Sequence, residues 1–332
     1  MTRYLVTGGA GFIGSNFVHL LNQRDPYADV IVLDKLTYAG NPKNLDGTDC
    51  ELIEGSIDNA ELVNNLVEQS DVVLNFAAES HNDNSLRDPG AFIQTNVAGT
   101  FQLLEAVRKF KVRLHHISTD EVFGDLPLNG ETRFTEETPY NPSSPYSATK
   151  ASSDHLVRAW IRSFGIDATI TNCSNNFGPR QHVEKFIPRA ITNLLEGKPI
   201  KIYGSGAQIR DWIHVDDHNS AVFAVLQRGR IGETYNIGAR NDKYTNLSVA
   251  EMLCEILGGD IEFVSDRAGH DQRYAIDPSK ITTELGWIPQ YGNSRSAMMD
   301  ALRDTVAWYE QHREWWEDTK PSIESAYAEE GH

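Results

Sequence analysis

The segment YLVTGGAGFIGSNF, residues 4–17, runs from an apolar stretch through three spaced glycines into a second apolar stretch. Gly8, Gly11 and Gly14 form the pattern G-x-x-G-x-x-G, which is typical of a strand that turns tightly into a helix. Glycines allow the backbone to approach a ligand closely, and the N-terminus of the following helix attracts a pyrophosphate. The segment therefore predicts a dinucleotide site. A glycine-rich turn without a ligand is the alternative interpretation.

An acidic residue at the end of the next expected strand supports the dinucleotide interpretation. Asp34 stands where a carboxylate accepts hydrogen bonds from the adenosine ribose and repels a 2′-phosphate, so the sequence favours NAD over NADP. Lys35 follows directly and acts against this preference. Asp58 has two interpretations: it reaches the adenine amino group, or it caps a helix that begins within SIDNAEL.

Strand and helix patterns alternate through the first half of the chain. Apolar runs occur at residues 4–7, 30–33, 72–76, 114–118 and 168–172. Segments of helical length separate them, so we expect an α/β fold with a Rossmann-type, doubly wound parallel sheet over residues 1–175. Residues 176–332 are expected to form a smaller, mixed α/β substrate-binding lobe, with segments that return to the main sheet as an option. The last dozen residues are rich in Glu, Ser and Ala and resemble a frayed tail.

Composition excludes several classes of protein. The chain has 332 residues and a net charge of −17, whereas a general nucleic-acid binder is normally basic. No apolar run reaches the roughly 18 residues that a membrane-spanning helix needs, and no leader pattern opens the chain. The three cysteines are far apart, which indicates neither a disulfide framework nor a metal site. We therefore expect a soluble, cytoplasmic protein that binds neither nucleic acid nor membranes.

The segment ISTDEVFG, residues 117–124, places reactive groups at the end of a buried strand. Thr119, Asp120 and Glu121 are consecutive there, and Tyr146 and Lys150 follow at positions i and i+4 of an expected helix. A lysine ammonium beside a phenol favours the phenolate, so we expect Lys150 to lower the pKa of Tyr146 and make it a usable base. The alternative is that Asp120 caps a turn and Glu121 faces solvent.

Several strings resemble those of the extended short-chain dehydrogenase/reductase family and, within it, those of the dTDP-glucose 4,6-dehydratases. They are TGGAGFIGS, DKLTYAGN, AAESH, STDEV, NPSSPYSATKASSD, NCSNNFGP, EKFIPR, IRDWIHVDDH, GETYNIG and DRAGHDQRYAID. The resemblance covers nearly the whole chain. It implies tightly held NAD, a nucleotide-sugar substrate (dTDP-glucose) and a homodimer built on two helices at 91–110 and 145–163. The chain departs from the family pattern at Asn82, Asn84 and Phe123, and its segment after Gly124 is short.

The resemblance also implies a division of labour among the reactive residues. Tyr146 accepts the proton of the sugar C4 hydroxyl while NAD accepts the hydride, and Thr119 bonds the C4 oxygen. Glu121 removes the C5 proton, and Asp120, protonated, gives its proton to the departing C6 oxygen. The hydride then returns to C6, so the net reaction is the loss of water.

Two sets of binding residues follow from these motifs. The cofactor set is Gly8, Gly11, Phe12, Ile13, Gly14, Asp34, Lys35, Thr37, Ile57, Asp58, Ala77, Ala78, Ser80, Thr95, Tyr146, Lys150 and Asn175. The substrate set is Ser80, His81, Thr119, Asn175, Lys185, Phe186, Lys201, Tyr203, Arg210, Asn246, Arg267 and His270. Any one of the lobe residues is alternatively a surface residue or part of a local ion pair, such as Arg210 with Asp211.

Other functions share much of this pattern. A nucleotide-sugar 4-epimerase needs NAD, tyrosine and lysine but no dehydrating acid pair, so Asp120 and Glu121 argue against it. GDP-mannose dehydratases and UDP-glucuronate decarboxylases usually have Ser where this chain has Asp120. A catalytically silent NAD sensor would have lost Tyr146 or Lys150. UDP-glucose remains open as a substrate, as does the downstream pathway of the product.

Overall fold

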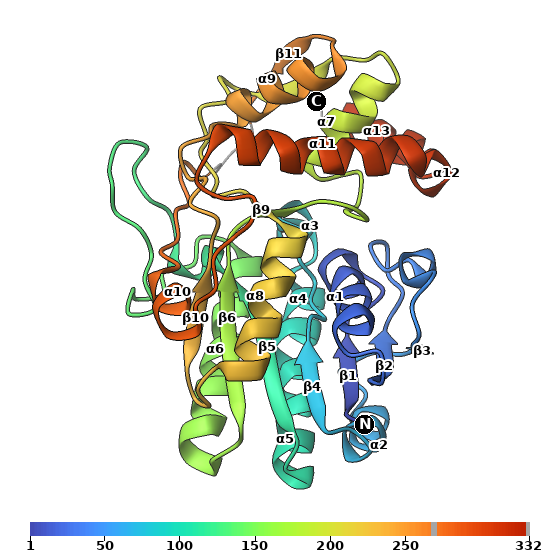
Figure 1. Ribbon diagram of the computed structural model, residues 1–332, viewed down its shortest axis with the longest axis vertical. Coiled ribbons are helices and arrows are strands. Elements are labelled where there is room, and N and C mark those ends of the chain that lie inside the picture. Colours follow the sequence, from blue (N-terminus) through green and yellow to red (C-terminus); the bar gives the residue numbers. More distant parts are fainter. Residues whose placement is uncertain (267–270, 330–332) are drawn as a thin grey trace.

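A seven-stranded, fully parallel sheet lies at the centre of the larger part of the protein (Figure 1). The computed structural model describes residues 1–266 and 271–329. The strand order is β10-β6-β5-β4-β1-β2-β3, which has its switch point beside β1. The strands are β1 (Arg3–Thr7), β2 (Asp29–Asp34), β3 (Glu51–Glu54), β4 (Val72–Asn75), β5 (Arg113–Thr119), β6 (Ala168–Cys173) and β10 (Thr234–Ile237). The predicted doubly wound parallel sheet is thus confirmed.

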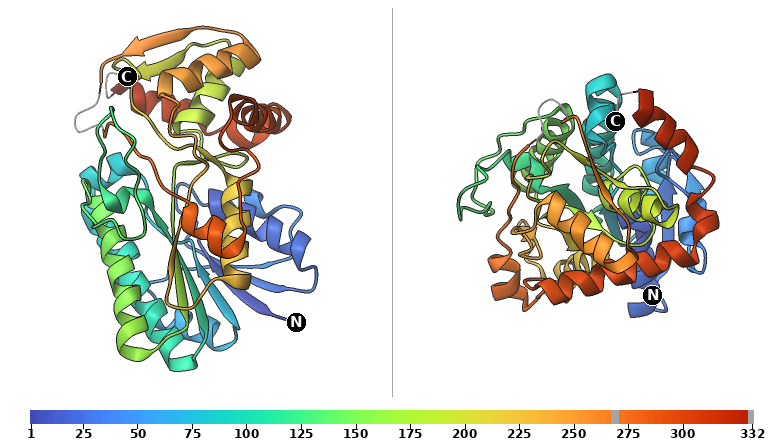
Figure 2. Two further views of the ribbon diagram at one scale, coloured as in Figure 1. Left: turned by 60° about the vertical axis from the view of Figure 1, so that its left-hand side comes forward. Right: turned by 90° about the horizontal axis from the view of Figure 1, so that it is seen from above.

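Helices cover both faces of the sheet because successive strand residues point to opposite sides. Tyr4 and Val6 of β1 pack against one helical layer, whereas Leu5 packs against the other. The first layer contains α1 (Phe12–Arg24), α8 (Val215–Arg228) and α10 (Ser279–Leu285). The second contains α2 (Ala60–Glu68), α5 (Thr100–Phe110) and α6 (Pro145–Phe164). Figure 2 shows these two layers on either side of the sheet.

Two elements from the second half of the chain complete the sheet region. Strand β10 pairs in parallel with β6, and α8 packs against α1 and the sheet. Short helices lie near the carboxyl ends of the strands. They are η1 (Pro42–Leu45), α3 (Asn82–Arg87), α4 (Pro89–Phe92), the π-helical η2 (Ile93–Gly99) and η3 (Asp120–Phe123). The helix expected at 91–110 is therefore assembled from α4, η2 and α5.

A smaller lobe lies beyond the carboxyl ends of the strands (Figure 1). Its core contains Ile187 and Ile191 of α7, Leu253 of α9 and Leu302 of α11. The lobe elements are β7 (Asn176–Phe177), α7 (Phe186–Leu195), β8 (Ile200–Tyr203), β9 (Ile213–His214), α9 (Asn246–Leu257), β11 (Ile261–Val264), α11 (Arg295–Gln311), α12 (Arg313–Trp316) and α13 (Lys320–Glu329). Strands β8 and β11 pair in parallel, as do β7 and β9. In the described residues, no helix has both the length and the apolar character that a membrane span requires.

Up to Glu329, the end of the chain is not the frayed tail that its composition suggested, and residues 330–332 lie outside the described part of the chain. Helix α13 runs from Lys320 to Glu329 and lies against α7. Glu324 accepts two hydrogen bonds from Arg189, at 2.9 and 2.8 Å, and Lys320 is 1% exposed. The prediction was wrong because these charged groups find partners in α7, and contacts so distant in sequence are not visible in local composition.

Candidate active site

A cavity of about 340 Å³ opens at the carboxyl ends of β1, β2, β4 and β5. Its wall brings together nearly all of the predicted cofactor residues. These are Gly8, Gly11, Phe12, Ile13, Gly14, Asp34, Lys35, Thr37, Ile57, Ala77, Ala78, Ser80, Thr95, Tyr146, Lys150 and Asn175. Asp58 is the one member of the set that does not line this cavity.

The glycines at the start of α1 are required by close backbone approach. Gly8 has φ +69°, and a Cβ there would lie 2.6 Å from the Ala77 nitrogen. A Cβ on Gly14 would meet the Gly8 carbonyl oxygen at less than a contact distance. The glycines therefore let the turn pack closely against the end of β4 and against itself. The turn lines the cavity at the N-terminus of α1, which fits a dinucleotide pyrophosphate there.

Asp34 stands at the end of β2 with its carboxylate on the cavity wall. Oδ2 accepts a hydrogen bond from the Ala10 nitrogen and Oδ1 accepts one from the Leu36 nitrogen, both at 2.9 Å. Burial raises the pKa of Asp34, while the backbone donors act in the opposite direction. These donors fix the carboxylate, and each oxygen keeps a second lone pair that a ribose hydroxyl would use.

Asp58 does not cap the helix that follows it, and its contact with the adenine amino group stays a prediction. Asn59, not Asp58, caps α2, because its side chain accepts a hydrogen bond from the Leu62 nitrogen. The Asp58 carboxylate instead accepts a 2.9 Å bond from the Gln94 amide. The N-cap interpretation was therefore wrong by one residue.

The acid pair at the end of β5 occupies two different environments. Asp120 is 1% exposed, and within the described chain its Oδ2 has no hydrogen-bond partner. Burial raises the pKa of Asp120 well above its usual value, and the negative charges of Glu121 and Asp211 raise it further. Asp120 is thus suited to keep its proton near neutral pH. The alternative that Asp120 caps a turn is wrong, because Thr119 caps η3.

Glu121 lies on the boundary between this cavity and a second one, because it lines both. One carboxylate oxygen accepts a 2.9 Å hydrogen bond from the Asn82 side chain. Burial raises the pKa of Glu121, whereas the bond from Asn82 and the charge of Arg210 lower it. Sequence reasoning treated Asn82 only as a departure from the family pattern and missed this contact.

Tyr146 and Lys150 project from the first turns of α6. Ser144 and Ser147 form a capping box and Pro145 begins the helix, so the N-terminus of α6 is firmly set. Burial raises the pKa of Tyr146 well above 10, and Glu121 and Cys173 raise it further. Among the protein groups alone, the pKa of Tyr146 is therefore raised overall rather than lowered. The Lys150 ammonium donates instead to the Ile117 carbonyl at 2.7 Å.

A buried polar network lies behind this face of α6. Asp154 is 0% exposed and accepts hydrogen bonds from Ser118 and Tyr140, both at 2.8 Å. His116 Nε2 lies 3.3 Å from its other oxygen. Burial raises the pKa of Asp154, but His116 and the nearby Lys150 lower it. The pKa of Asp154 is lowered overall. The spacing Lys150-x-x-x-Asp154 was the sequence signal that this residue shares a helix face with the lysine.

The second cavity, of about 490 Å³, lies between the sheet edge and the lobe. It gathers the predicted substrate residues Ser80, His81, Asn175, Lys185, Phe186, Lys201, Tyr203, Arg210 and Asn246. Thr119 lines the neighbouring cavity instead. Arg267 and His270 lie outside the described residues.

The cations of this cavity are held in different ways. Arg210 donates to the backbone carbonyls of Ile209 and Asp271, at 2.8 and 2.9 Å, rather than to Asp211. Its guanidinium also lies 4.4 Å from the ring centre of Tyr274. Lys185 Nζ lies 3.6 Å from Glu184. The predicted ion pair of Arg210 with Asp211 is therefore absent from the contacts of the described residues.

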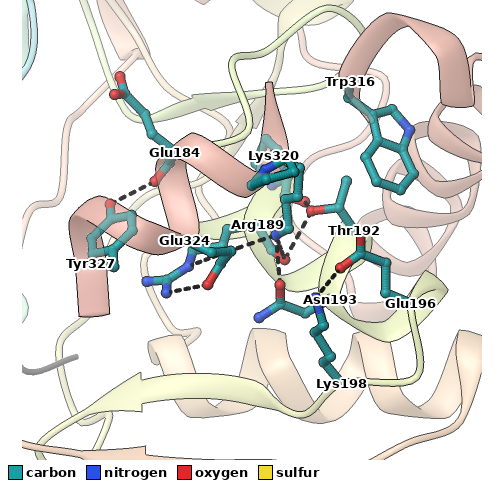
Figure 3. A network of polar contacts seen from close by, with 12 residues as sticks. Glu184, Arg189, Thr192, Asn193, Glu196, Lys198, Trp316, Lys320, Glu324 and Tyr327 are labelled. Atoms are coloured by element: carbon teal, nitrogen blue, oxygen red, sulfur yellow. Dashed lines mark hydrogen bonds and ion pairs between the residues drawn. The ribbon is translucent and has the colours of Figure 1, made fainter. Parts of the chain in front are cut away.

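A cluster of charged side chains closes the far wall of the same cavity (Figure 3). Arg189 of α7 is paired with Glu324 of α13, and its guanidinium lies 3.7 Å from the ring centre of Tyr327. The Tyr327 hydroxyl donates to the Glu184 carbonyl at 2.9 Å. The buried Lys320 donates to the Asn193 side chain at 2.6 Å. Through these contacts α13 becomes part of the cavity wall.

Comparison of the sequence and the fold with those of known proteins identifies related enzymes. A family model described as GDP-mannose 4,6 dehydratase matches residues 5–298. The dTDP-glucose 4,6-dehydratase of Mycobacterium tuberculosis is 56% identical, with 99% of each chain covered, and that of Mycolicibacterium smegmatis is 54% identical with the same coverage. The chain belongs to the dTDP-glucose 4,6-dehydratase family. A solved family member is DesIV, the dTDP-glucose 4,6-dehydratase from Streptomyces venezuelae with NAD and TYD bound. It has a TM-score of 0.89 and is 45% identical, covering 95% of this chain and 99% of its own.

The departures from the dTDP-glucose 4,6-dehydratase pattern occupy distinct places in the structure. Phe123 is buried and stacks on Phe134 with ring centres 5.1 Å apart, so it serves packing. Asn84 lies on α3 and lines neither cavity, although its side chain bonds Tyr38 in the wall of the smaller one. Asn82 is the departure that contacts a reactive residue.

Proposed function

We propose that the protein converts dTDP-glucose to dTDP-4-keto-6-deoxy-glucose, with NAD as a cofactor that is regenerated in each turnover. The observation that carries this proposal is the acid pair, in which Asp120 is buried beside Glu121 at the junction of the two cavities. An oxidation at C4 alone needs no such pair, whereas elimination across C5 and C6 needs a base and an acid. Membership of the family and the NAD-bound relative support the same reaction.

The residues around α6 serve the oxidation step. Tyr146 accepts the proton of the C4 hydroxyl, and Thr119 bonds the C4 oxygen. Bound NAD supplies the acceptor for the C4 hydride and the donor that returns it to C6. Because protein groups raise the pKa of Tyr146, an added positive charge beside the phenol is needed to form the phenolate. Lys150, fixed by the Ile117 carbonyl, holds the ammonium on this side of the cavity.

The acid pair then serves the loss of water. A ketone at C4 acidifies the C5 hydrogen, and Glu121 removes that proton. Asp120 gives its proton to the C6 oxygen, which leaves as water. Opposite roles for adjacent carboxyl groups require different environments, and full burial gives Asp120 the stronger tendency to remain protonated.

Binding of the nucleotide sugar uses the lobe. We assign the diphosphate to Lys185 and Arg210, since both cations line the larger cavity. Asn175 and Asn246 are placed for polar contacts, and Tyr203 for contact with the base. The assignments of Arg267 and His270 stay predictions. Cytoplasmic location stays a prediction as well.

We also propose that two copies associate through α5 and α6. Phe101 of α5 and Phe164 of α6 are 39% and 49% exposed, and Ile93 of the adjoining η2 is 56% exposed. Large apolar side chains gathered on neighbouring helices are typical of a protein interface. A Phe101→Glu variant that remained a dimer in solution would contradict this assignment.

Separate incubations with dTDP-glucose and UDP-glucose test the function. We expect a 4-keto sugar from dTDP-glucose without net consumption of NAD. Substrate deuterated at C4 should give product deuterated at C6, and the label should not cross between molecules in a mixture of carbon-labelled substrates. Stoichiometric release of reduced cofactor that carries the label would show a simple dehydrogenase instead, and label lost to water would contradict hydride transfer from C4.

A further inference from the structure

The Asn82 side chain joins two parts of the active site that the sequence separates. Asn82 is the first residue of α3, and it lines the larger cavity. Its Nδ2 donates to Glu121 Oε2 at 2.9 Å, and its Oδ1 accepts a 2.8 Å hydrogen bond from the Ser144 hydroxyl. Ser144 caps the helix that carries Tyr146. One amide thus connects the residue beside Asp120 to the N-terminus of α6.

The contacts themselves determine which way this amide faces. The Glu121 carboxylate accepts hydrogen bonds and cannot donate when ionised, so the NH₂ group of Asn82 must face it. The carbonyl oxygen of Asn82 then faces the Ser144 hydroxyl, which can donate. Ser144 Oγ also accepts from the Ser147 nitrogen at 3.1 Å, which leaves its proton available for Asn82. The directions of all three bonds are mutually consistent.

Glu121 depends on this donor because its other surroundings are mixed. Arg210 and Lys185 favour its ionised form, whereas Asp271 and the neighbouring Asp120 disfavour it. Tyr146 and Tyr274 also feel its charge. Burial raises the pKa of Glu121, and the Asn82 bond is the largest influence in the opposite direction. A charge-assisted bond to a buried carboxylate also restricts the rotation of its side chain.

We propose that Asn82 is a positioning residue that directs the Glu121 carboxylate at C5 while holding it in register with the helix of Tyr146. This inference rests on the proposed role of Glu121 as the C5 base. Asn82 does not contact the reacting atoms of the substrate itself, since it acts on the substrate through Glu121. The consequence is that the elimination step, rather than the oxidation step, depends on residue 82.

Two substitutions separate the donor from the shape of the side chain. Asn82→Asp keeps the size and the acceptor for Ser144 but replaces the donor with a second carboxylate facing Glu121. Asn82→Val removes both polar contacts. Asn84→Asp is the matched control, because it makes the same change on the same helix at a residue outside both cavity walls.

The experiment measures two steps of a single turnover as a function of pH. Reduced-nicotinamide absorbance follows oxidation at C4, and loss of deuterium from C5-labelled substrate follows proton removal. For Asn82→Val we expect the acid limb of C5 proton removal to move up by about one pH unit, because the carboxylate loses one charge-assisted bond. Asn82→Asp should move it further, whereas Asn84→Asp should leave it in place. Oxidation at C4 should remain close to the parent rate in all three variants.

Distinct results would overturn the inference and the proposed function. An acid limb unchanged in both Asn82 variants would overturn the inference, and so would an equal loss of both steps without a pH shift, which is the mark of a merely structural residue. If Asn82→Val fails to fold, the isosteric Asn82→Asp alone decides. Parent protein that yields no 4-keto sugar from either nucleotide sugar would overturn the proposed function instead.

Discussion

Two regions of the protein that bury ionised side chains differ in the partners that they give to a carboxylate. Behind α6, the single carboxylate of Asp154 is surrounded by neutral donors such as Ser118 and Tyr140. Between α7 and α13, the carboxylate of Glu324 contacts two cations, Arg189 and Lys320. The first region places one negative charge near Lys150, whereas in the second a single carboxylate is shared by two cations.

The difference separates chemistry from anchoring. A buried charge without a full local partner changes the protonation of its neighbours, which is useful where protons move. A cluster of direct ion pairs instead fixes the elements that contribute to it. We therefore expect the residues at the carboxyl ends of the strands to determine reaction rates. The α7–α13 cluster should determine how firmly α13 docks on the lobe. Four experiments test this division.

The largest effect is expected from a matched pair of tyrosine variants. Tyr146→Phe removes the proton acceptor for the C4 hydroxyl and should slow oxidation by roughly 10⁴-fold. Tyr327→Phe removes only the bond to the Glu184 carbonyl in the lobe and should leave oxidation nearly unchanged. Reduced-nicotinamide absorbance in a single turnover provides the measurement. Comparable slowing in both variants would contradict the proposed division.

A smaller effect is expected when the acid of the sheet edge is removed. Asp120→Asn should leave oxidation intact and slow water loss by roughly 10²–10³-fold, because the C6 oxygen then leaves without a proton donor. In the parent, water loss should decline as pH rises through the raised pKa of Asp120, since only the protonated acid is active. Parent-like turnover in Asp120→Asn would remove this residue from the mechanism.

Cofactor selection should respond more modestly. Asp34→Ala removes a carboxylate from the ribose end of the cavity, and NAD binding should weaken roughly tenfold, while NADP loses less or gains. Titration of the purified protein with each nucleotide measures both affinities. A parent that already prefers NADP would show that Asp34 has been misassigned.

The smallest change concerns stability. Glu324→Gln removes the carboxylate shared by Arg189 and Lys320 and should cost about 1–2 kcal/mol of unfolding free energy at pH 7. Burial raises the pKa of Glu324, but the two cations outweigh it and lower the pKa to about 2, from an ordinary value of 4.5. A depressed carboxyl pKa stabilises the fold at neutral pH and loses this effect as pH falls from about 4.5 to 2.

The difference in stability between the parent and Glu324→Gln should therefore shrink over that pH window, as chemical denaturation at several pH values would reveal. Glu255→Gln is the control, since Glu255 pairs with Arg295 at an exposed position. An equal loss in both variants would show that the α7–α13 cluster is no more than a surface pair.

The sequence predicted the sheet well because its signals are local. Apolar runs that end in Thr7, Asp34 or Thr119 give the strand direction, and right-handed crossovers leave few arrangements for parallel strands. The chain end was misjudged because Lys320 and Glu324 gain their meaning from Arg189, which lies far away in the sequence. The acid at an i+4 spacing from Lys150 was visible but was not used.

The candidate site shows the same limit at the level of single residues. Glycine spacing and the strand end identified the cavity lining, because these motifs carry their geometry with them. The bridge from Glu121 through Asn82 to Ser144 joins three separate segments, so no local pattern predicts it. The prediction of a lowered Tyr146 pKa met the same limit. The spacing places Lys150 on the same helix face as Tyr146, but it does not reveal the burial that raises the pKa of Tyr146.

Strand β10 has a consequence for how the chain folds as it is made. The β6 edge stays unpaired, and α8 is missing from one face of β1, until the segment following the first lobe strands has been synthesised. A nascent chain that ends before α8 therefore exposes an open strand edge and apolar residues such as Val6 and Phe17. Such a fragment is prone to aggregate, and the larger part of the protein cannot be released from the ribosome as an independent folding unit ahead of the lobe.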